Sequence, residues 1–279
     1  MGEDKSTMIT GTRLLRNNRE GNEVLESTGY GRLLLLLAVG MTLSGMIVIS
    51  LRGGGSSWNS WMFLDLGLSD HSAKWIERAL LFLSLAMALL PIAGPGKNRW
   101  LLFLVPAFLF LLAESFFTAR MGGTGYANWA PSAYALRYAT PLALMMFLFR
   151  SPFGEAQAGS LLRIALGLVF LTHGAEAFLH YPRFIDLIIN SAANLGGWRI
   201  PESEAKSLLT WIGVMDMTLA LAVVFRPFRA LLWWMAAWGL ITALSRLTAN
   251  GWGAYPELLL PTTHFVVPFV LLKYRKTIP

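Results

Sequence analysis

The chain has 279 residues, of which 55% are hydrophobic and only 14% carry a charge. A typical soluble domain has about 45–50% apolar and about 25% charged residues. Cysteine is absent, which excludes disulfides, thiolate catalysis and cysteine-ligated metal or iron–sulfur sites. The net charge of +7 comes from basic residues at the ends of long apolar runs, so we attribute it to membrane topology and expect no nucleic-acid partner. The composition predicts a polytopic membrane protein.

A polar, charged tail over residues 1–31 precedes the first apolar run. About 20 apolar residues are needed to cross a bilayer as a helix, and eight runs in this chain meet or approach that length. Because these runs lack the alternation of barrel strands, we expect all of them to be helices. The predicted spans are residues 33–51, 78–94, 100–119, 133–150, 161–181, 208–226, 228–247 and 255–273.

The distribution of positive charge predicts the orientation. Of the 23 lysines and arginines, 14 fall on the side that holds both termini, and the other side has fewer despite its longer loops. Cytoplasmic loops carry the excess of Lys and Arg, so we expect a bacterial-type cytoplasmic (inner) membrane protein with both termini in the cytoplasm. The loops 52–77 and 182–207 then lie outside. In the second loop, Pro182–Leu195 has the apolar spacing of an amphipathic surface helix, with Phe184, Leu187 and Ile188 on one face.

The two halves of the chain repeat the same landmarks in the same order. Four predicted spans precede residues 151–160 and four follow, and the matching landmarks are 126 to 136 positions apart: Arg32 and Arg163, Trp75 and Trp211, Arg120 and Arg246, Pro141 and Pro268. These matches predict a duplicated four-helix unit, and the even number of spans in each unit makes the two units parallel. The expected organisation is a cytoplasmic tail (1–31), a first four-helix membrane unit (32–150), a linker (151–160) and a second unit (161–279). The predicted fold class is therefore all-α integral membrane, with eight transmembrane helices in two parallel four-helix bundles.

The second half also resembles a known family. It begins Leu162-Arg163-Ile164-Ala165-Leu166-Gly167-Leu168-Val169-Phe170-Leu171-Thr172-His173-Gly174, and its next span opens Trp211-Ile212-Gly213-Val214-Met215-Asp216. This pattern is similar to the DoxX-like family of small four-helix membrane proteins, which open with Arg, a Leu-Gly pair and a His-Gly pair and carry an acidic residue in the second span. The resemblance covers residues 160–272 and, through the duplication, extends more faintly to 30–150. In the first half Thr42 takes the place of His173, and Leu80 that of Asp216.

Relatives in that family include the membrane subunit of a thiosulfate:quinone oxidoreductase, so the resemblance implies quinone-linked redox work. We therefore expect a redox protein, or the membrane subunit of a redox complex, that sits in the lipid bilayer with other membrane protein subunits. The alternative is a non-catalytic scaffold of a larger membrane assembly. A small-molecule transporter is a third option, which the duplication favours and the lack of paired helix breaks opposes.

Ionisable side chains inside the predicted spans mark the candidate site, because such groups are costly in a membrane. His173, Glu176 and His180 share one stripe of the fifth span. At about 100° per residue, His180 lies about 20° and Glu176 about 60° around the helix from His173. The sixth span adds Asp216, and the seventh ends at Arg246. The eighth has Glu257 and His264, seven residues apart and on one face. The first half offers only Glu114, Arg120 and Arg137, so we expect the chemistry in the second unit.

This set of residues is compatible with several kinds of site. In a quinone site, a histidine binds a carbonyl and a carboxylate relays the accompanying proton. His173, His180, Glu257 and His264 are then the cofactor-binding candidates, with Glu176, Asp216 and Arg246 as proton relay and charge partner. Haem ligation by His173 (or His180) with His264 is a second interpretation. A third is a non-haem metal on His173, Glu176, His180 and Asp216.

A structural interpretation also fits the same residues. Asp216 pairs with Arg246 in this view, and His264 donates to Glu176, which fixes the geometry of the bundle without any ligand. The sequence leaves all of these interpretations open.

Overall fold

The structure is a computed structural model that describes residues 29–93, 98–122, 125–147 and 152–274. Within these ranges the chain is helical apart from short connections and contains no strand. Six helices are long and apolar enough to cross a membrane, and a bent pair near the C-terminus raises the number to seven. These features support a helical, multi-pass membrane protein. The predicted tail 1–31 lies almost entirely outside the described residues.

The first half of the chain begins with a long helix over Gly29–Leu51, which contains the predicted span 33–51. A short helix and a second long one follow in the predicted outer loop and second span. The elements after the first helix are α2 (Ser57–Leu64), α3 (Asp70–Ala93), η1 (Asn98–Leu104), α4 (Val105–Met121), η2 (Gly125–Trp129), α5 (Ala130–Ala133) and α6 (Ala135–Met146).

The second half contains the longest helix, and it begins earlier than expected. The elements are α7 (Pro152–Phe178), α8 (Pro182–Gly196), α9 (Glu202–Phe225), α10 (Arg229–Asn250), η3 (Trp252–Ala254), α11 (Tyr255–Leu259) and α12 (Thr262–Tyr274). The predicted linker 151–160 is therefore helical from Pro152 onward. The amphipathic helix expected from residue 182 is present as α8.

Two of the expected spans differ from a single long helix, so the count of eight is not confirmed. In the fourth, the chain breaks at Tyr134 between α5 and α6, and α6 has only 12 residues. In the eighth, the helical axis bends by 49° between α11 and α12. Pro261 stands at this bend, and proline has no amide hydrogen to continue the helical bonding and clashes with the preceding turn.

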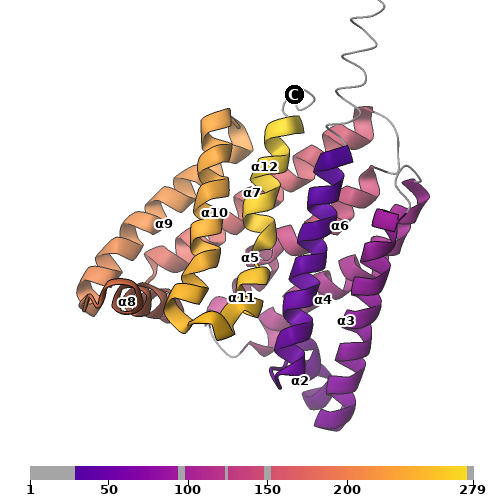
Figure 1. Cartoon of the computed structure of the whole chain (residues 1–279), viewed down its shortest axis with the longest axis horizontal. Helices are drawn as coiled ribbons and strands as arrows, with labels where there is room; N and C mark the ends of the chain where they lie inside the picture. The colour runs from indigo at the N-terminus through magenta and orange to yellow at the C-terminus, as the bar shows by residue number, and fades with distance from the viewer. Residues whose placement is uncertain (1–28, 94–97, 123–124, 148–151, 275–279) are drawn as a thin grey trace, which may run out of the picture.

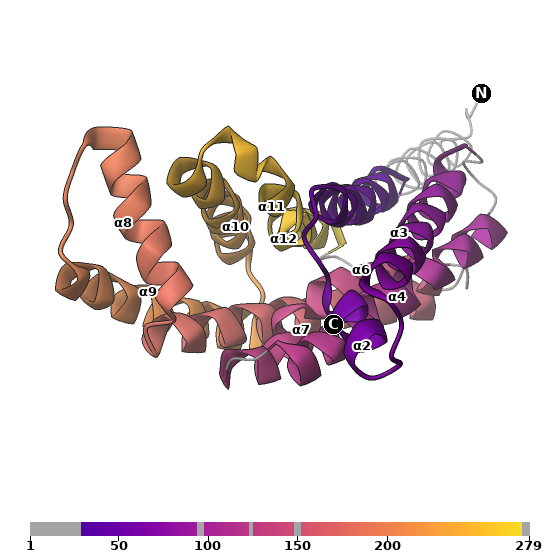
Figure 2. The ribbon, with the colours of Figure 1, turned by 90° about the horizontal axis from the view of Figure 1, so that it is seen from below.

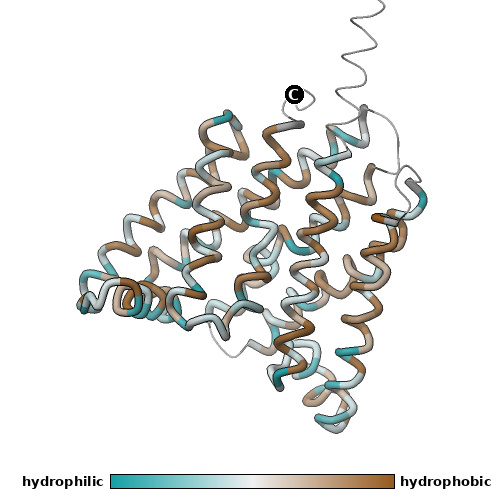
Figure 3. Tube along the Cα trace, viewed as in Figure 1, coloured by the Kyte–Doolittle hydropathy of each residue, from teal (hydrophilic) through white to brown (hydrophobic). Residues whose placement is uncertain are grey.

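Successive long helices alternate in direction between two edges of the molecule (Figure 1). The first helix begins and α12 ends at the upper edge in that view, whereas α2 and α8 lie at the lower edge. Figure 2 shows α7 and α9 along one face and α10, α12 and the first helix along the opposite face. Apolar residues run along the lengths of the helices (Figure 3), as expected for segments in contact with lipid.

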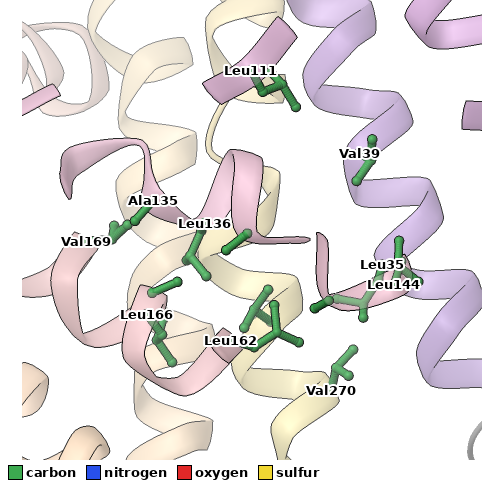
Figure 4. Close-up of a cluster of buried hydrophobic side chains, with 14 of the residues drawn as sticks. Leu35, Val39, Leu111, Ala135, Leu136, Leu144, Leu162, Leu166, Val169 and Val270 are labelled. Atoms are coloured by element: carbon green, nitrogen blue, oxygen red, sulfur yellow. The ribbon is translucent and has the colours of Figure 1, made fainter. Parts of the chain in front are cut away.

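One hydrophobic cluster joins the two halves of the chain. Buried side chains of the first helix, such as Leu35 and Val39, pack in the same cluster as Leu162 and Leu166 of α7 and Val270 of α12 (Figure 4). Helix α7 also contacts α6 and α12. Because residues of both predicted units contribute to this core, the packing of each half depends on the other.

The crossing of α7 and α9 is unusually close because glycines face each other there. A Cβ atom on Gly213 would lie 2.6 Å from the Gly174 carbonyl oxygen, and one on Gly174 would lie 2.9 Å from the Met217 amide nitrogen. Real side chains do not tolerate such distances, so neither position accepts a larger residue without a shift of the backbone. Small residues of this kind allow membrane helices to approach closely.

We predict that Gly213→Ala lowers the stability of the protein, although alanine favours helix formation by up to about 1 kcal/mol over glycine. The added methyl group overpacks the crossing, which typically costs about 1–3 kcal/mol. Thermal unfolding in detergent measures the effect. Gly40→Ala in the first helix is the matched control, because the nearest atoms to its Cβ are 3.7 Å and 3.9 Å away on leucine side chains. Equal midpoints for the two variants would contradict the tight crossing.

Candidate functional site

A cavity of about 250 Å³ lies among α7, α8, α9, α10 and α12. Its walls are mostly apolar. Its polar side chains are His173, Ser191, Asp216, Trp238, Thr242, Ser245, Arg246 and His264. The structure therefore brings together four of the seven residues that the sequence singled out, and it does so from four different helices.

Close helix contacts bring two of these four residues to the cavity. The glycine crossing of α7 and α9 places Asp216 directly against the backbone of Gly174, where an added Cβ would lie 3.0 Å from the Asp216 Cβ. On the other side, a Cβ on Gly239 of α10 would lie 2.8 Å from the His264 carbonyl oxygen. Since α10 and α12 touch at this point, His264 of α12 reaches the cavity past α10.

His173 is held by its own helix and stands next to His264. Its Nδ1 lies 2.7 Å from Glu176 Oε2, a hydrogen bond within one helical turn. Glu176 is buried, with 6% of its surface exposed, and is absent from the cavity wall. The ring centroids of His173 and His264 are 5.6 Å apart. Glu176 thus orients the His173 ring, whose other nitrogen is free to meet a ligand.

Three buried polar atoms of the cavity-lining residues have no hydrogen-bond partner among the described residues. They are Asp216 Oδ1, Trp238 Nε1 and His264 Nε2. The Trp238 indole lies beside the Asp216 carboxyl group but outside hydrogen-bonding geometry. Buried polar groups are nearly always satisfied in folded proteins, because an unpaired one costs about 1–3 kcal/mol. The cavity wall thus offers polar atoms of Asp216, Trp238 and His264 that are available for hydrogen bonds.

The pairs expected from the structural interpretation are not formed within the described chain. No ion pair joins Asp216 to Arg246, and His264 makes no hydrogen bond with Glu176. Instead, Arg246 Nη1 donates to the Thr242 carbonyl oxygen one turn earlier, at 2.6 Å. Of the two carboxyl groups, that of Glu176 is hydrogen-bonded to the His173 ring.

Helix α8 lies at the lower edge of the molecule (Figure 1) and forms part of the cavity wall. Four residues on one of its faces line the cavity: Phe184, Leu187, Ile188 and Ser191. The helix is fastened to the end of α10, where Ser191 Oγ lies 2.7 Å from Thr248 Oγ1 and Asn194 Nδ2 donates to the carbonyls of Thr248 and Ala249, each at 2.9 Å. The apolar spacing predicted this helix, but it gave no sign that the helix lines a cavity.

Two candidate residues lie away from the cavity. Helix α7 ends at Phe178, and His180 follows in a left-handed conformation with a φ of 60°. Its Nε2 meets Thr210 Oγ1 of α9 at 2.9 Å, so the side chain fastens the end of α7 to α9. Glu257 is exposed at the start of α11. Within the described ranges, no three His, Asp or Glu side chains converge as they would around a metal ion, so the predicted set of four metal ligands is not assembled.

Trp238 is the main cavity residue that sequence reasoning missed. It lies in a tryptophan-rich stretch with Trp233 and Trp234, both half exposed on the surface of α10. Composition therefore favoured a packing role for all three. Only the direction of Trp238 toward α9 distinguishes it, and the sequence does not specify that direction.

Comparison of the chain with protein-family models, with characterised proteins and with solved structures finds no match. The resemblance to the DoxX-like family therefore stays a prediction that depends on the motifs around His173 and Asp216. The functional hypothesis is therefore based on the geometry of the cavity.

We predict that His180→Gly is more stable than His180→Ala, by about 1 kcal/mol. Both variants lose the bond to Thr210, but only alanine keeps a Cβ that opposes the left-handed backbone. Thermal unfolding of the two purified variants measures the difference. Because His180 is absent from the cavity wall, both variants should bind ligand with wild-type affinity, and a tenfold or greater loss of affinity in both would place the His180 imidazole in the site.

Proposed function

We propose that the protein binds the head group of a membrane quinone in this cavity and acts as the membrane subunit of a quinone-linked redox complex. The observation that carries the proposal is the set of unpartnered atoms on Asp216, Trp238 and His264 around an apolar cavity between membrane helices. A quinone has the complementary chemistry, because its flat apolar ring carries polar oxygens on opposite edges. Sites for such ligands are mostly apolar, with a few polar groups that fix the orientation.

The size of the cavity favours a small head group. At about 250 Å³ it falls slightly below the range of roughly 300–1,000 Å³ that is common for drug-sized ligands. A one-ring quinone fits this space better than the four-ring macrocycle of haem. Ile241 of α10 lines the cavity and is also 54% exposed, so we infer that the cavity opens toward the lipid at this side chain. A long apolar tail can therefore leave the cavity into the bilayer.

The chain's own groups fit the roles of hydrogen bonding and proton transfer. The Trp238 N–H and the His264 ring nitrogen are the groups that hydrogen-bond the ring oxygens. Asp216 of α9 holds or accepts a proton at the cavity wall. The hydrogen-bonded Glu176–His173 pair of α7 does the same. The apolar side chains of α8 exclude water from these groups. A quinone, when bound, supplies the redox chemistry, and we assign electron delivery to a partner subunit.

We further propose the predicted topology: a duplicated DoxX-like protein that crosses a bacterial-type inner membrane eight times, with both termini in the cytoplasm. The support is that the first helix begins at the same edge at which α12 ends, and that α2 and α8 share the opposite edge (Figure 1). The alternating direction of the intervening helices agrees with an even number of crossings.

Labelling of single cysteines tests this orientation without background, because the chain contains no cysteine. Ser203, exposed at the start of α9, belongs to the predicted outer edge, and Arg226, exposed just after α9, belongs to the inner edge. We expect a membrane-impermeant maleimide to modify Ser203→Cys in intact cells and Arg226→Cys only after lysis. The reverse pattern would invert the topology, and labelling of both in intact cells would contradict a membrane-spanning α9.

Quinone binding is tested with the purified protein and an alkylated methoxy-benzoquinone, by titration calorimetry in detergent. Asp216→Ala and His264→Ala each delete one hydrogen-bonding group, which weakens binding by roughly 1–2 kcal/mol, so we expect about tenfold lower affinity in each variant. His173→Ala should weaken binding similarly. The control is His71→Ala, since His71 is exposed at the start of α3 and does not line the cavity.

All of these variants should remain monodisperse, which gel filtration verifies. Absence of quinone binding by the wild-type protein, together with its migration in a larger complex after gentle solubilisation, would favour the scaffold function instead. Equal affinities of wild type, Asp216→Ala and His264→Ala would show that the quinone binds elsewhere.

A further inference from the structure

One end of the cavity concentrates positive charge from both halves of the chain. Arg246 of α10 lines the cavity at the end covered by α8. Arg137 of α6, which belongs to the first half, lies close enough for its charge to act on both Arg246 and His264. Two guanidinium groups, one from each half of the chain, therefore lie near this end of the cavity. In a membrane interior, such a group of cations calls for a negative partner.

No carboxylate of the described residues contacts either arginine. Glu257 acts on Arg246 only from a distance and is itself exposed. Glu114, the acid whose charge acts on Arg137, binds the backbone amides of Ser57 and Trp58 at 3.1 Å and 3.2 Å. Arg137 instead stacks over the ring of Tyr134, at 3.9 Å from its centroid. The positive end of the cavity thus has no contacting counter-charge within the described part of the chain.

The acidic group of the cavity is placed at a distance from this end. Asp216 lies against Gly174 and beside Trp238. Trp238 precedes Arg246 by eight residues on α10, which corresponds to about 12 Å along the helix axis. The cavity therefore has a carboxyl group toward one end and a guanidinium group at the other, and a ligand that spans it meets a different polar group at each edge.

We propose that the ligand is an anionic amphiphile: a quinone that carries an ionised oxygen next to one ring carbonyl and places that oxygen at Arg246. This inference depends on the quinone-binding function proposed above and adds the charge of the head group. The planar guanidinium binds two adjacent oxygens at once, and such charge-assisted pairs are about twice as strong as neutral hydrogen bonds. The charge of Arg137 adds to the attraction for the ionised oxygen, although Arg137 does not line the cavity.

The test compares two probes with the same alkyl chain, a hydroxy-benzoquinone whose hydroxyl group is ionised at neutral pH and its methoxy counterpart, which is neutral. We expect wild-type protein to bind the hydroxy probe at least about tenfold more tightly. One charge-assisted hydrogen bond in a site that excludes water contributes enough free energy for about a tenfold change in affinity. Arg246→Gln should abolish this preference, and Arg246→Lys should retain only part of it, because the charge stays but the paired hydrogen bonds of the guanidinium are lost. Arg120→Gln is the control, because Arg120 is exposed and pairs with Asp65.

A second measurement needs no variant. Below the pKa of the probe's hydroxyl group, the hydroxy probe becomes neutral, and wild-type protein should then bind the two probes equally; the methoxy probe reports any titration of the protein itself. Equal binding of the two probes at neutral pH, with both still sensitive to Asp216→Ala, would overturn the anionic preference and leave quinone binding intact. A preference that survives Arg246→Gln would also overturn it. Binding of neither probe would overturn both proposals.

Discussion

The close approach of α7 and α9 through Gly174 and Gly213 is the constraint on which the candidate site depends. Backbone atoms of one helix occupy the space of a side chain on the other, which sets both the distance between the helices and their register. That register places Asp216 against Gly174, the residue that follows His173. The His-Gly pair and the apolar-Gly opening of the next span are therefore a packing motif and a site motif at once: each glycine positions the ionisable residue near it.

The site also depends on the half of the chain that lacks the motif. Thr42, which takes the place of His173 in the first half, is buried and donates to a carbonyl of its own helix, so it offers no polar group to a ligand. The first half instead contributes Arg137, through the contacts of α6 with α7 and α12. Because the shared hydrophobic core joins the halves, the second unit by itself would lose one of the two cations.

Local spacing predicted most of the helices, and four of the seven candidate residues that it singled out line one cavity. His173 and Glu176 share a face, and membrane-embedded Asp216 and His264 converge from neighbouring helices, as the stripe argument requires. The same argument failed for His180, because α7 ends at Phe178 and the backbone then turns left-handed, so a projection at 100° per residue no longer applies. It failed for Glu257 because the 49° bend before α12 separates that residue from the face of His264. Neither a helix end nor a proline bend is represented when residue spacing is projected onto one continuous helix.

The arrangement of charges separates a ligand site from a purely structural cluster. If the ionisable residues served only to fix the bundle, Asp216 and Arg246 would pair, since an unpaired charge between membrane helices costs several kcal/mol. No ion pair joins Asp216 to Arg246 among the described residues, and both line the cavity that apolar side chains of α8 also line. On the proposal made above, a ligand supplies the missing partners of these groups. Such a ligand binds the folded state and not the unfolded chain, so its binding raises the free energy of unfolding.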